Sequence, residues 1–295
     1  GQRFDKYIFK LLKNAGTGLI FKQLRNKNIV LNGKKAKGNE ILKENDSVRI
    51  FMSDDTINKF TGGPLHISKT GFRLDVIYED DDILLASKPV GVLSQKSSDK
   101  DISMNEYLIE YLTDNGFGKE NLATFKPSFC NRLDRNTSGL MIAGKSLRGL
   151  QKMSEIIKDR SIHKFYLTIV KGIVDKKSVI KGYLRKDEKN NKVVIYDNPV
   201  KDSYEIHTEY EPLATKDDMT LLKVRLITGK THQIRAHLAG ISHPVLGDFK
   251  YGDKVFNEKY GEKRQLLHSY QVVFPKLDNF PDISEKSFNT PYPVN

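Results

Sequence analysis

Helical patterns open the chain. Apolar residues recur at helical spacing at Phe4, Tyr7, Ile8, Leu11 and Leu12, and Ala15-Gly16 ends that pattern. Thr17 can cap a second helix that turns Leu19, Ile20 and Leu24 inward. The first 25 residues therefore predict two short amphipathic helices.

A hairpin signal follows the helices. Ile29-Val30-Leu31 leads into Asn32-Gly33, a strong two-residue turn signal, and Val48, Ile50 and Met52 alternate as a strand does. Residues 53–71 contain few apolar side chains and include Gly62-Gly63-Pro64. We therefore expect a small α/β domain over residues 1–52, a linker over residues 53–71 and a larger domain over residues 72–295.

Short strand-like runs dominate the larger domain. They lie at residues 83–86, 139–143, 165–170, 193–195 and 221–227. Helical patterns interrupt them after a Ser103–Glu106 capping box and after Ser146, and residues 230–240 also have a helical pattern. Strands and helices do not alternate regularly, which argues against a doubly wound parallel sheet. The pattern predicts an α+β domain with a mixed, largely antiparallel sheet.

Positive charge is concentrated in the first domain. The chain has 49 Lys and Arg against 37 Asp and Glu, with a net charge of +12. Ten of these cations lie in residues 1–37, where Asp5 is the single acid. A basic surface favours a polyanionic partner. The single cysteine, Cys130, excludes an internal disulfide and a thiolate metal cluster, and we expect a cytoplasmic protein with no membrane span.

The first domain resembles the S-four RNA-binding module named after a small-subunit ribosomal protein. The matching segments are Arg3-Phe4-Asp5-Lys6, Thr17-Gly18-Leu19-Ile20 and Val30-Leu31-Asn32-Gly33-Lys34. The resemblance implies that the second helix and the hairpin face RNA phosphates, against the alternative of an ordinary solvated basic face. The candidate RNA-binding residues are Arg3, Lys6, Lys22, Arg25, Lys27, Lys34 and Lys35.

A polar loop carries the first chemical signal. Asp134 lies between Arg132 and Arg135, ahead of an apolar strand. Adjacent cations favour an ionised carboxylate, which can act as a nucleophile. A surface ion pair that orders a turn is the competing interpretation, and the loop alone favours it.

Three ordered motifs resemble those of RluA-type pseudouridine synthases. They are Arg132-Leu133-Asp134 with Thr137-Ser138-Gly139-Leu140, then Lys164-Phe165-Tyr166 with Val170-Lys171-Gly172, then residues 228–238. His243-Pro244, Gly247-Asp248, Tyr251-Gly252, Lys88-Pro89 and residues 264–268 extend the likeness over most of residues 75–275. One departure is Asn131, where the family usually has a histidine. An amide there can hydrogen-bond and hold the loop, but it cannot titrate near neutral pH.

The resemblance implies an enzyme that isomerises uridine to pseudouridine after flipping the nucleotide out of the RNA. It implies Asp134 beside the sugar, Arg235 as a two-point partner of that carboxylate, and Tyr166 as a stacking platform for uracil. The competing interpretations are a helix-surface arginine for Arg235 and a packed core tyrosine for Tyr166. Whether Asp134 bonds to the sugar or removes a sugar proton stays open. Candidate substrate-binding residues are Lys88, Asn131, Arg132, Arg135, Thr231, His232 and Gln233.

The reaction involves no redox change, so we expect no cofactor and no metal. His232, His237 and His243 are better explained as hydrogen-bonding or RNA-contacting groups than as zinc ligands. We expect a monomer that acts on structured RNA, with large-subunit ribosomal RNA or a ribosome-assembly intermediate as the substrate. The alternatives are a synthase acting on transfer RNA, a non-catalytic RNA-binding relative, and a hydrolase that pairs Asp134 with Asp248.

Overall fold

The computed structural model describes the chain except for residues 62–68, 99, 119–121, 123–124 and 292–295. Its residues cluster into two compact units. Unit 1 comprises Gly1–Lys69 with Ile109–Lys126, and unit 2 comprises Thr70–Leu108 with Pro127–Asn295. None of the described helices is long and apolar enough to cross a membrane.

Unit 1 begins with the elements that the sequence predicts. They are α1 (Phe4–Leu11), α2 (Thr17–Arg25), β1 (Ile29–Leu31), β2 (Lys34–Lys35) and β3 (Val48–Ile50). The strands form an antiparallel sheet in the order β2-β1-β3. Asn32 and Gly33 both have positive φ, as a two-residue hairpin turn requires. Helix α2 begins at Thr17 and its N-cap is Gly16, so the expected capping role of Thr17 is wrong.

Part of the expected linker is a helix. The composition of residues 53–71 predicts a linker, whereas α3 (Asp54–Thr61) forms there. Ser53 contacts the Thr56 hydroxyl at 2.8 Å, and Phe60 packs against the core of unit 1. A serine followed by two acids is a helix-start signal, and burial of Phe60 stabilises the short helix. The Gly62-Gly63-Pro64 signal lies outside the described residues.

Unit 2 is built on one large sheet, and its α+β class agrees with the expectation. Within the described residues the sheet has eleven strands, with a main path ordered β10-β9-β11-β12-β8-β13-β7-β5-β4. Its pairings are antiparallel except for β13 against β7. The strands are β4 (Asp75–Glu79), β5 (Ile83–Lys88), β6 (Ser128–Phe129), β7 (Ser138–Gly144), β8 (His163–Lys171), β9 (Ser178–Asp187), β10 (Lys192–Tyr196), β11 (Tyr204–Lys216), β12 (Met219–Leu226), β13 (Leu267–Val273) and β14 (Ser287–Asn289).

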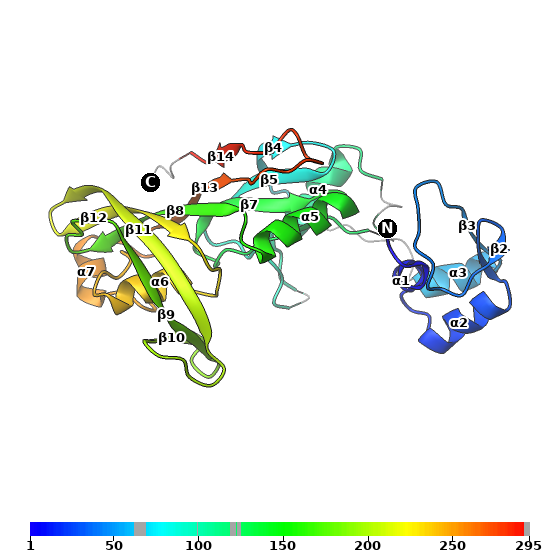
Figure 1. The fold of residues 1–295 in the computed structure, drawn as a ribbon, viewed down its shortest axis with the longest axis horizontal. Coiled ribbons are helices and arrows are strands. Elements are labelled where there is room, and N and C mark those ends of the chain that lie inside the picture. Colours follow the sequence, from blue (N-terminus) through cyan, green and yellow to red (C-terminus); the bar gives the residue numbers. More distant parts are fainter. Residues whose placement is uncertain (62–68, 99, 119–121, 123–124, 292–295) are drawn as a thin grey trace. The chain divides into compact units, whose positions relative to one another are not determined.

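Helices lie near both ends of this sheet (Figure 1). They are α4 (Met104–Asp114), of which the residues from Ile109 onward cluster with unit 1, α5 (Leu147–Lys158), α6 (Gln233–Gly240) and α7 (Lys254–Lys259). The expected capping signals are confirmed: the Ser103 hydroxyl donates to Glu106 at 2.7 Å, and the Ser146 hydroxyl accepts from the Gly149 amide at 2.9 Å. Met153 and Ile156 of α5 pack in a core cluster with residues of β5, β7 and β13.

The junction of β7, β13 and β8 positions the candidate site. Strand β13 pairs in parallel with β7 and antiparallel with β8, so three segments distant in sequence lie side by side. Gly139 permits this approach. Its φ is +106°, and a Cβ there would collide with the backbone of Ser269 on β13. The loop before β7 is thereby held next to Tyr166 of β8.

Candidate active site

The three motif segments meet in one pocket of unit 2. Its cavity volume is about 60 Å³. The lining residues are Arg132, Leu133, Asp134, Thr137, Tyr166, Leu226, Lys230, His232, Gln233, Ile234, Arg235 and Leu267. Asp134 comes from the loop before β7, Tyr166 from β8, and His232 and Arg235 from the start of α6. All of these lining residues except Leu226 lie in the three motifs or in the further match at residues 264–268.

Arg235 joins two carboxylates. Its Nη1 donates to Asp134 Oδ2 at 2.8 Å. Its Nε and Nη2 donate to the two oxygens of Asp248 at 2.6 and 2.8 Å. The expected two-point pairing with Asp134 is therefore wrong, because the guanidinium fork faces Asp248 and leaves one nitrogen for Asp134. This leaves Asp134 with one guanidinium contact and a side chain that is 25% exposed.

Asp248 is a buried anchor. Its side chain has no exposed surface, and the backbone amides of Lys250 and Tyr251 also donate to its Oδ1. Burial alone would raise its pKa, but the hydrogen bonds from Arg235 and these amides lower the pKa below its usual value. A carboxylate committed in this way cannot activate water, so the hydrolase alternative that pairs Asp134 with Asp248 is wrong. The Gly247-Asp248 match in the sequence gives no indication that Asp248 anchors Arg235.

Tyr166 forms part of the pocket wall. The residue is 5% exposed. Burial and then the Asp134 charge raise the pKa of its hydroxyl to about 12, against the lowering effect of a hydrogen bond with Ser269. The ring is therefore neutral and largely packed within the protein, and it also lines the pocket.

His232 lies close to the same Asp134 oxygen that Arg235 contacts. Its Nε2 is 3.9 Å from Asp134 Oδ2, and its Nδ1 is 2.9 Å from the Tyr251 hydroxyl. The residue is the N-cap of α6 and has a left-handed backbone, with φ of 54° and ψ of 14°. Burial lowers the pKa of the imidazole below 6.5, against the opposing effect of the Asp134 charge. The ring is therefore neutral at pH 7.

Lys88 does not line the pocket. Its side chain is fully buried, and its ammonium donates to the carbonyl oxygens of Pro89, Val92 and Arg135 at 2.8–2.9 Å. An ammonium has three donors, and all three are used. The expected role in substrate binding is therefore corrected: Lys88 ties the loop after Asp134 to the end of β5.

Further buried contacts hold the same loop. Asn131 is 9% exposed, and its Oδ1 accepts from the Ile142 amide at 2.8 Å. The Ser94 hydroxyl donates to the Leu133 carbonyl at 2.8 Å and accepts from the Leu133 amide at 2.9 Å. Asn131 therefore orders the loop by hydrogen bonding, which an amide does without titrating.

Gln233 is also a structural residue. Its Oε1 accepts from the Thr228 hydroxyl and the Lys230 amide, and its Nε2 donates to His207 O and Thr208 Oγ1. These four bonds use both donors and both acceptor positions of the amide. Its expected role in substrate binding is corrected to one of fixing the turn into α6.

The remaining substrate-binding candidates are exposed. Arg132 lines the pocket, whereas Thr231 and Arg135 do not. The Arg135 guanidinium donates through Nε to the Gly91 carbonyl at 2.9 Å. Arg132 is therefore an exposed cation beside the Asp134 carboxylate.

The other histidines of the third motif make local hydrogen bonds. His237 Nδ1 lies 2.8 Å from the Thr208 hydroxyl, and His243 Nδ1 lies 2.8 Å from the Lys171 carbonyl. Burial lowers the pKa of His237 to about 4. In the part of the chain that the structure describes, no three His, Cys, Asp or Glu side chains converge as a metal site requires.

The seven basic candidates of unit 1 are all exposed. Lys22 and Arg25 lie on α2, and Lys34 and Lys35 form β2. Arg3 differs from these because its guanidinium pairs with Asp5 through Nη2–Oδ2 at 2.6 Å and Nε–Oδ1 at 3.2 Å. Part of the hydrogen-bonding capacity of Arg3 is therefore used by Asp5 within unit 1.

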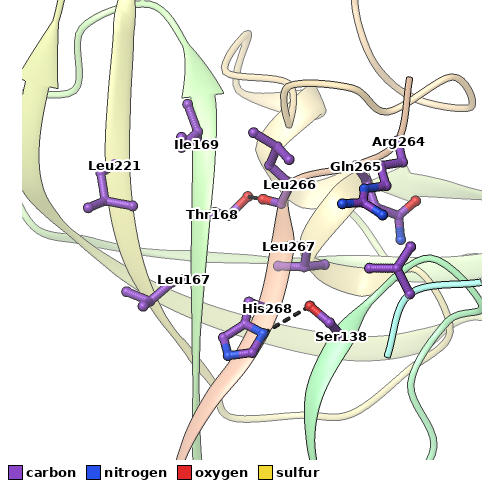
Figure 2. Close-up of a pocket in the computed structure, with 11 residues that line it drawn as sticks. Ser138, Leu167, Thr168, Ile169, Leu221, Arg264, Gln265, Leu266, Leu267 and His268 are labelled. Atoms are coloured by element: carbon purple, nitrogen blue, oxygen red, sulfur yellow. Dashed lines mark hydrogen bonds between the residues drawn. The ribbon is translucent and has the colours of Figure 1, made fainter. Parts of the chain in front are cut away.

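A larger cavity lies beside the pocket but lacks its chemistry (Figure 2). Its volume is about 180 Å³, and Leu167, Ile169, Leu221 and Leu266 contribute apolar walls. Two of its polar side chains are bonded to each other: Ser138 Oγ lies 2.9 Å from His268 Nδ1, and burial lowers the pKa of His268 to about 4. Among the residues that the structure describes, no carboxylate lines this cavity. The smaller pocket with Asp134 is therefore the candidate reaction site.

Residues 82–240 match the family described as RNA pseudouridylate synthase. An uncharacterised RNA pseudouridine synthase of Mycoplasma genitalium is 32% identical over 294 residues, covering 97% of this chain and 90% of that protein. The ribosomal large subunit pseudouridine synthase C of Buchnera aphidicola is 31% identical, covering 92% and 85%. The synthase C of Pasteurella multocida is 28% identical, covering 93% and 82%.

A solved structure shares the fold. The human RNA pseudouridylate synthase domain containing 1 aligns with a TM-score of 0.59 and 21% identity, over 74% of this chain and 83% of that chain.

Proposed function

The chain belongs to the RNA pseudouridine synthase family and isomerises uridine to pseudouridine in RNA, and we propose that its substrate is bacterial large-subunit ribosomal RNA. The names of the synthase C relatives, which span nearly the whole chain, support this substrate. Ribosomal RNA as substrate also assigns the protein to the cytoplasm, where we expect it to act as a monomer.

Asp134 is the carboxylate that acts on the target nucleoside in this proposal. Isomerisation breaks the bond between uracil N1 and the anomeric carbon, turns the base, joins C5 to that carbon, and moves the C5 proton to solvent as N1 gains one. Cleavage develops positive charge at the anomeric carbon, which an adjacent carboxylate stabilises. The observation that carries the proposal is the 2.8 Å contact between Arg235 and Asp134 inside a pocket that Tyr166 also lines.

Arg235 and Tyr166 have separate tasks. Because Asp248 occupies two of its nitrogens, Arg235 holds Asp134 in one orientation and leaves its other oxygen for the sugar. Tyr166 supplies an aromatic face for the everted uracil, since stacking contributes about 1–3 kcal/mol per base. Arg132, exposed at the pocket, is suited to a nearby phosphate.

Unit 1 binds RNA outside the target nucleotide in this proposal. The exposed lysines and arginine of α2 and β2 support it, together with the helix, helix and hairpin order typical of the S-four module. Phosphate contacts add affinity without sequence information. The catalytic pocket then needs to select only the uridine.

The test is tritium release from ribosomal RNA labelled at C5 of uridine. We expect the wild type to release tritium, and Asp134→Asn to release none while it still binds the RNA. Asp197→Asn, at an exposed carboxylate outside the pocket, is the matched control and should keep wild-type turnover. Normal release by Asp134→Asn would remove this carboxylate from the reaction. Release from transfer RNA alone would reject the ribosomal substrate.

A further inference from the structure

His232 is held in an unusual backbone conformation next to Asp134. Its φ of 54° lies in the left-handed region, which only a few per cent of residues other than Gly adopt, with Asn, Asp and His the most frequent among them. His232 lies in the turn before α6, and four hydrogen bonds of Gln233 fix this turn. Backbone strain that a structure maintains next to a reactive group points to a task for that side chain.

The hydrogen bonds of Tyr251 determine where the imidazole proton lies. The backbone amide of Val193 donates to the Tyr251 hydroxyl oxygen at 2.8 Å. This amide has a hydrogen and no acceptor capacity, so the tyrosine must accept there and direct its own hydrogen elsewhere. His232 Nδ1, at 2.9 Å, is the other partner that the structure records for this hydroxyl among the described residues. If Nδ1 were protonated and donated to the second lone pair of the Tyr251 oxygen, the tyrosine hydrogen would have no recorded partner among the described residues; if Nδ1 accepts, that hydrogen is bonded. We therefore infer that Nδ1 accepts.

A neutral imidazole has one N–H and one bare nitrogen. Burial lowers the pKa of His232, so the ring is neutral at pH 7. With Nδ1 as the acceptor, the proton is on Nε2. That atom is 3.9 Å from Asp134 Oδ2, which exceeds hydrogen-bonding distance. Nε2–H is thus a donor that faces the pocket without a partner at bonding distance in Asp134.

We propose that His232 is a hydrogen-bond donor of the catalytic site, held in its Nε2–H tautomer by Tyr251, and that this donor contacts O2 of the target uracil. The proposal rests on the proposed function of Asp134, because a sugar beside that carboxylate brings the attached base next to His232. Tyr251 is then a positioning residue, since it acts through the imidazole.

The chemistry of the leaving base selects O2. When the bond between N1 and the anomeric carbon breaks, its electron pair passes to the uracil ring and spreads over N1 and the carbonyl oxygens. O2 is the carbonyl oxygen adjacent to N1, and therefore the one nearest to the sugar and to Asp134. A donor fixed before the reaction stabilises this developing charge without reorganisation. His232 keeps its proton throughout.

The tautomer can be measured without substrate. Nitrogen-15 spectra of the wild-type protein labelled at histidine, assigned by comparison with His232→Asn, should show a protonated Nε2 and a bare Nδ1 for His232 at pH 7. Tyr251→Phe should shift that population towards the Nδ1–H form. A protonated Nδ1 in the wild type would overturn the proposal, whatever RNA the enzyme uses.

Two substitutions separate donation from a structural role. Glutamine at 232 can place an amide N–H near the position of Nε2, whereas asparagine reaches only the position of Nδ1 and can still bond Tyr251. Asparagine tolerates a left-handed backbone better than glutamine does. A purely structural role therefore predicts that His232→Asn is the better enzyme. Donation predicts the reverse, with kcat about 10²-fold lower for His232→Asn and within about tenfold of wild type for His232→Gln.

A modified substrate tests the assignment to O2. Sulfur accepts hydrogen bonds more weakly than oxygen, so RNA with 2-thiouridine at the target should react more slowly with the wild type. We expect the ratio of the rate with uridine to the rate with 2-thiouridine to be smaller in His232→Asn than in the wild type, because the donor is already absent. An equal ratio in both enzymes would overturn the contact with O2. Normal turnover by Asp134→Asn would instead show that the proposed function is wrong, while the nitrogen-15 result for His232 would stand.

Discussion

Replacing Asp248 by asparagine tests whether this buried carboxylate anchors Arg235. The change keeps the size of the side chain but removes the charge that faces two guanidinium nitrogens at 2.6 and 2.8 Å. Removing one partner of a buried ion pair costs about 3–5 kcal/mol. Because Arg235 keeps Asp134 as a second partner, we expect the lower end, about 3 kcal/mol. At about 2–4 °C per kcal/mol for 150–250 residues, Tm should fall by about 6–12 °C.

The lowered pKa of Asp248 determines how the Tm difference between wild type and Asp248→Asn changes with pH. The folded-state pKa of Asp248 is lowered, so its stabilising contribution is present above the unfolded-state value of about 3.9 and is lost as the pH falls through the folded-state value. The Tm difference between wild type and Asp248→Asn should therefore be constant from about pH 6 to 8 and narrow below about pH 4.

Thermal unfolding followed by circular dichroism measures both effects, with Asp197→Asn as the control at an exposed carboxylate. The rate of tritium release should fall more than about tenfold for Asp248→Asn at a temperature where it is folded, since Arg235 loses the anchor that orients it towards Asp134. Equal Tm values at pH 7, or wild-type turnover, would refute the anchoring role.

Three further predictions concern other groups. Lys88→Met should lower Tm by more than about 5 °C with little change in RNA affinity, because three carbonyls lose the buried ammonium that donates to them; an unchanged Tm would contradict this. Tyr166→Phe should bind RNA as the wild type does, whereas Tyr166→Ala should bind about 5- to 150-fold more weakly if the ring stacks on uracil; equal affinities for the two variants would argue against stacking. Neutralising Lys22, Arg25 and Lys34 together should lower the slope of log K against log salt by about 2–3, and an unchanged slope would remove these cations from the RNA interface.

Local patterns were sufficient for much of the fold. Helical periodicity predicts α1 and α2, and the Asn32-Gly33 turn predicts the β1–β2 hairpin. The Ser103–Glu106 capping box locates α4, and Ser146 at the N-cap locates α5. Helix α3 was missed because its exposed face is charged and its apolar residues are few, so burial of Phe60 rather than propensity stabilises it.

Site membership was predictable, whereas the assignment of individual contacts was not. Motif resemblance brings Asp134, Tyr166 and Arg235 to one pocket, as the structure does. It cannot show which carboxylate receives the two-point contact, because that depends on where the loop carrying Asp248 lies in space. Burial also reverses the interpretation of Lys88, since a lysine in a sequence is ordinarily exposed.

The position of residue 134 relative to the target sugar is the most direct test of the account. Crystals of Asp134→Asn with substrate RNA would trap the nucleotide before cleavage. We predict an everted uridine on Tyr166, with its anomeric carbon about 3–3.5 Å from the side chain at position 134. A target uridine bound elsewhere, with its sugar far from this side chain, would contradict the account.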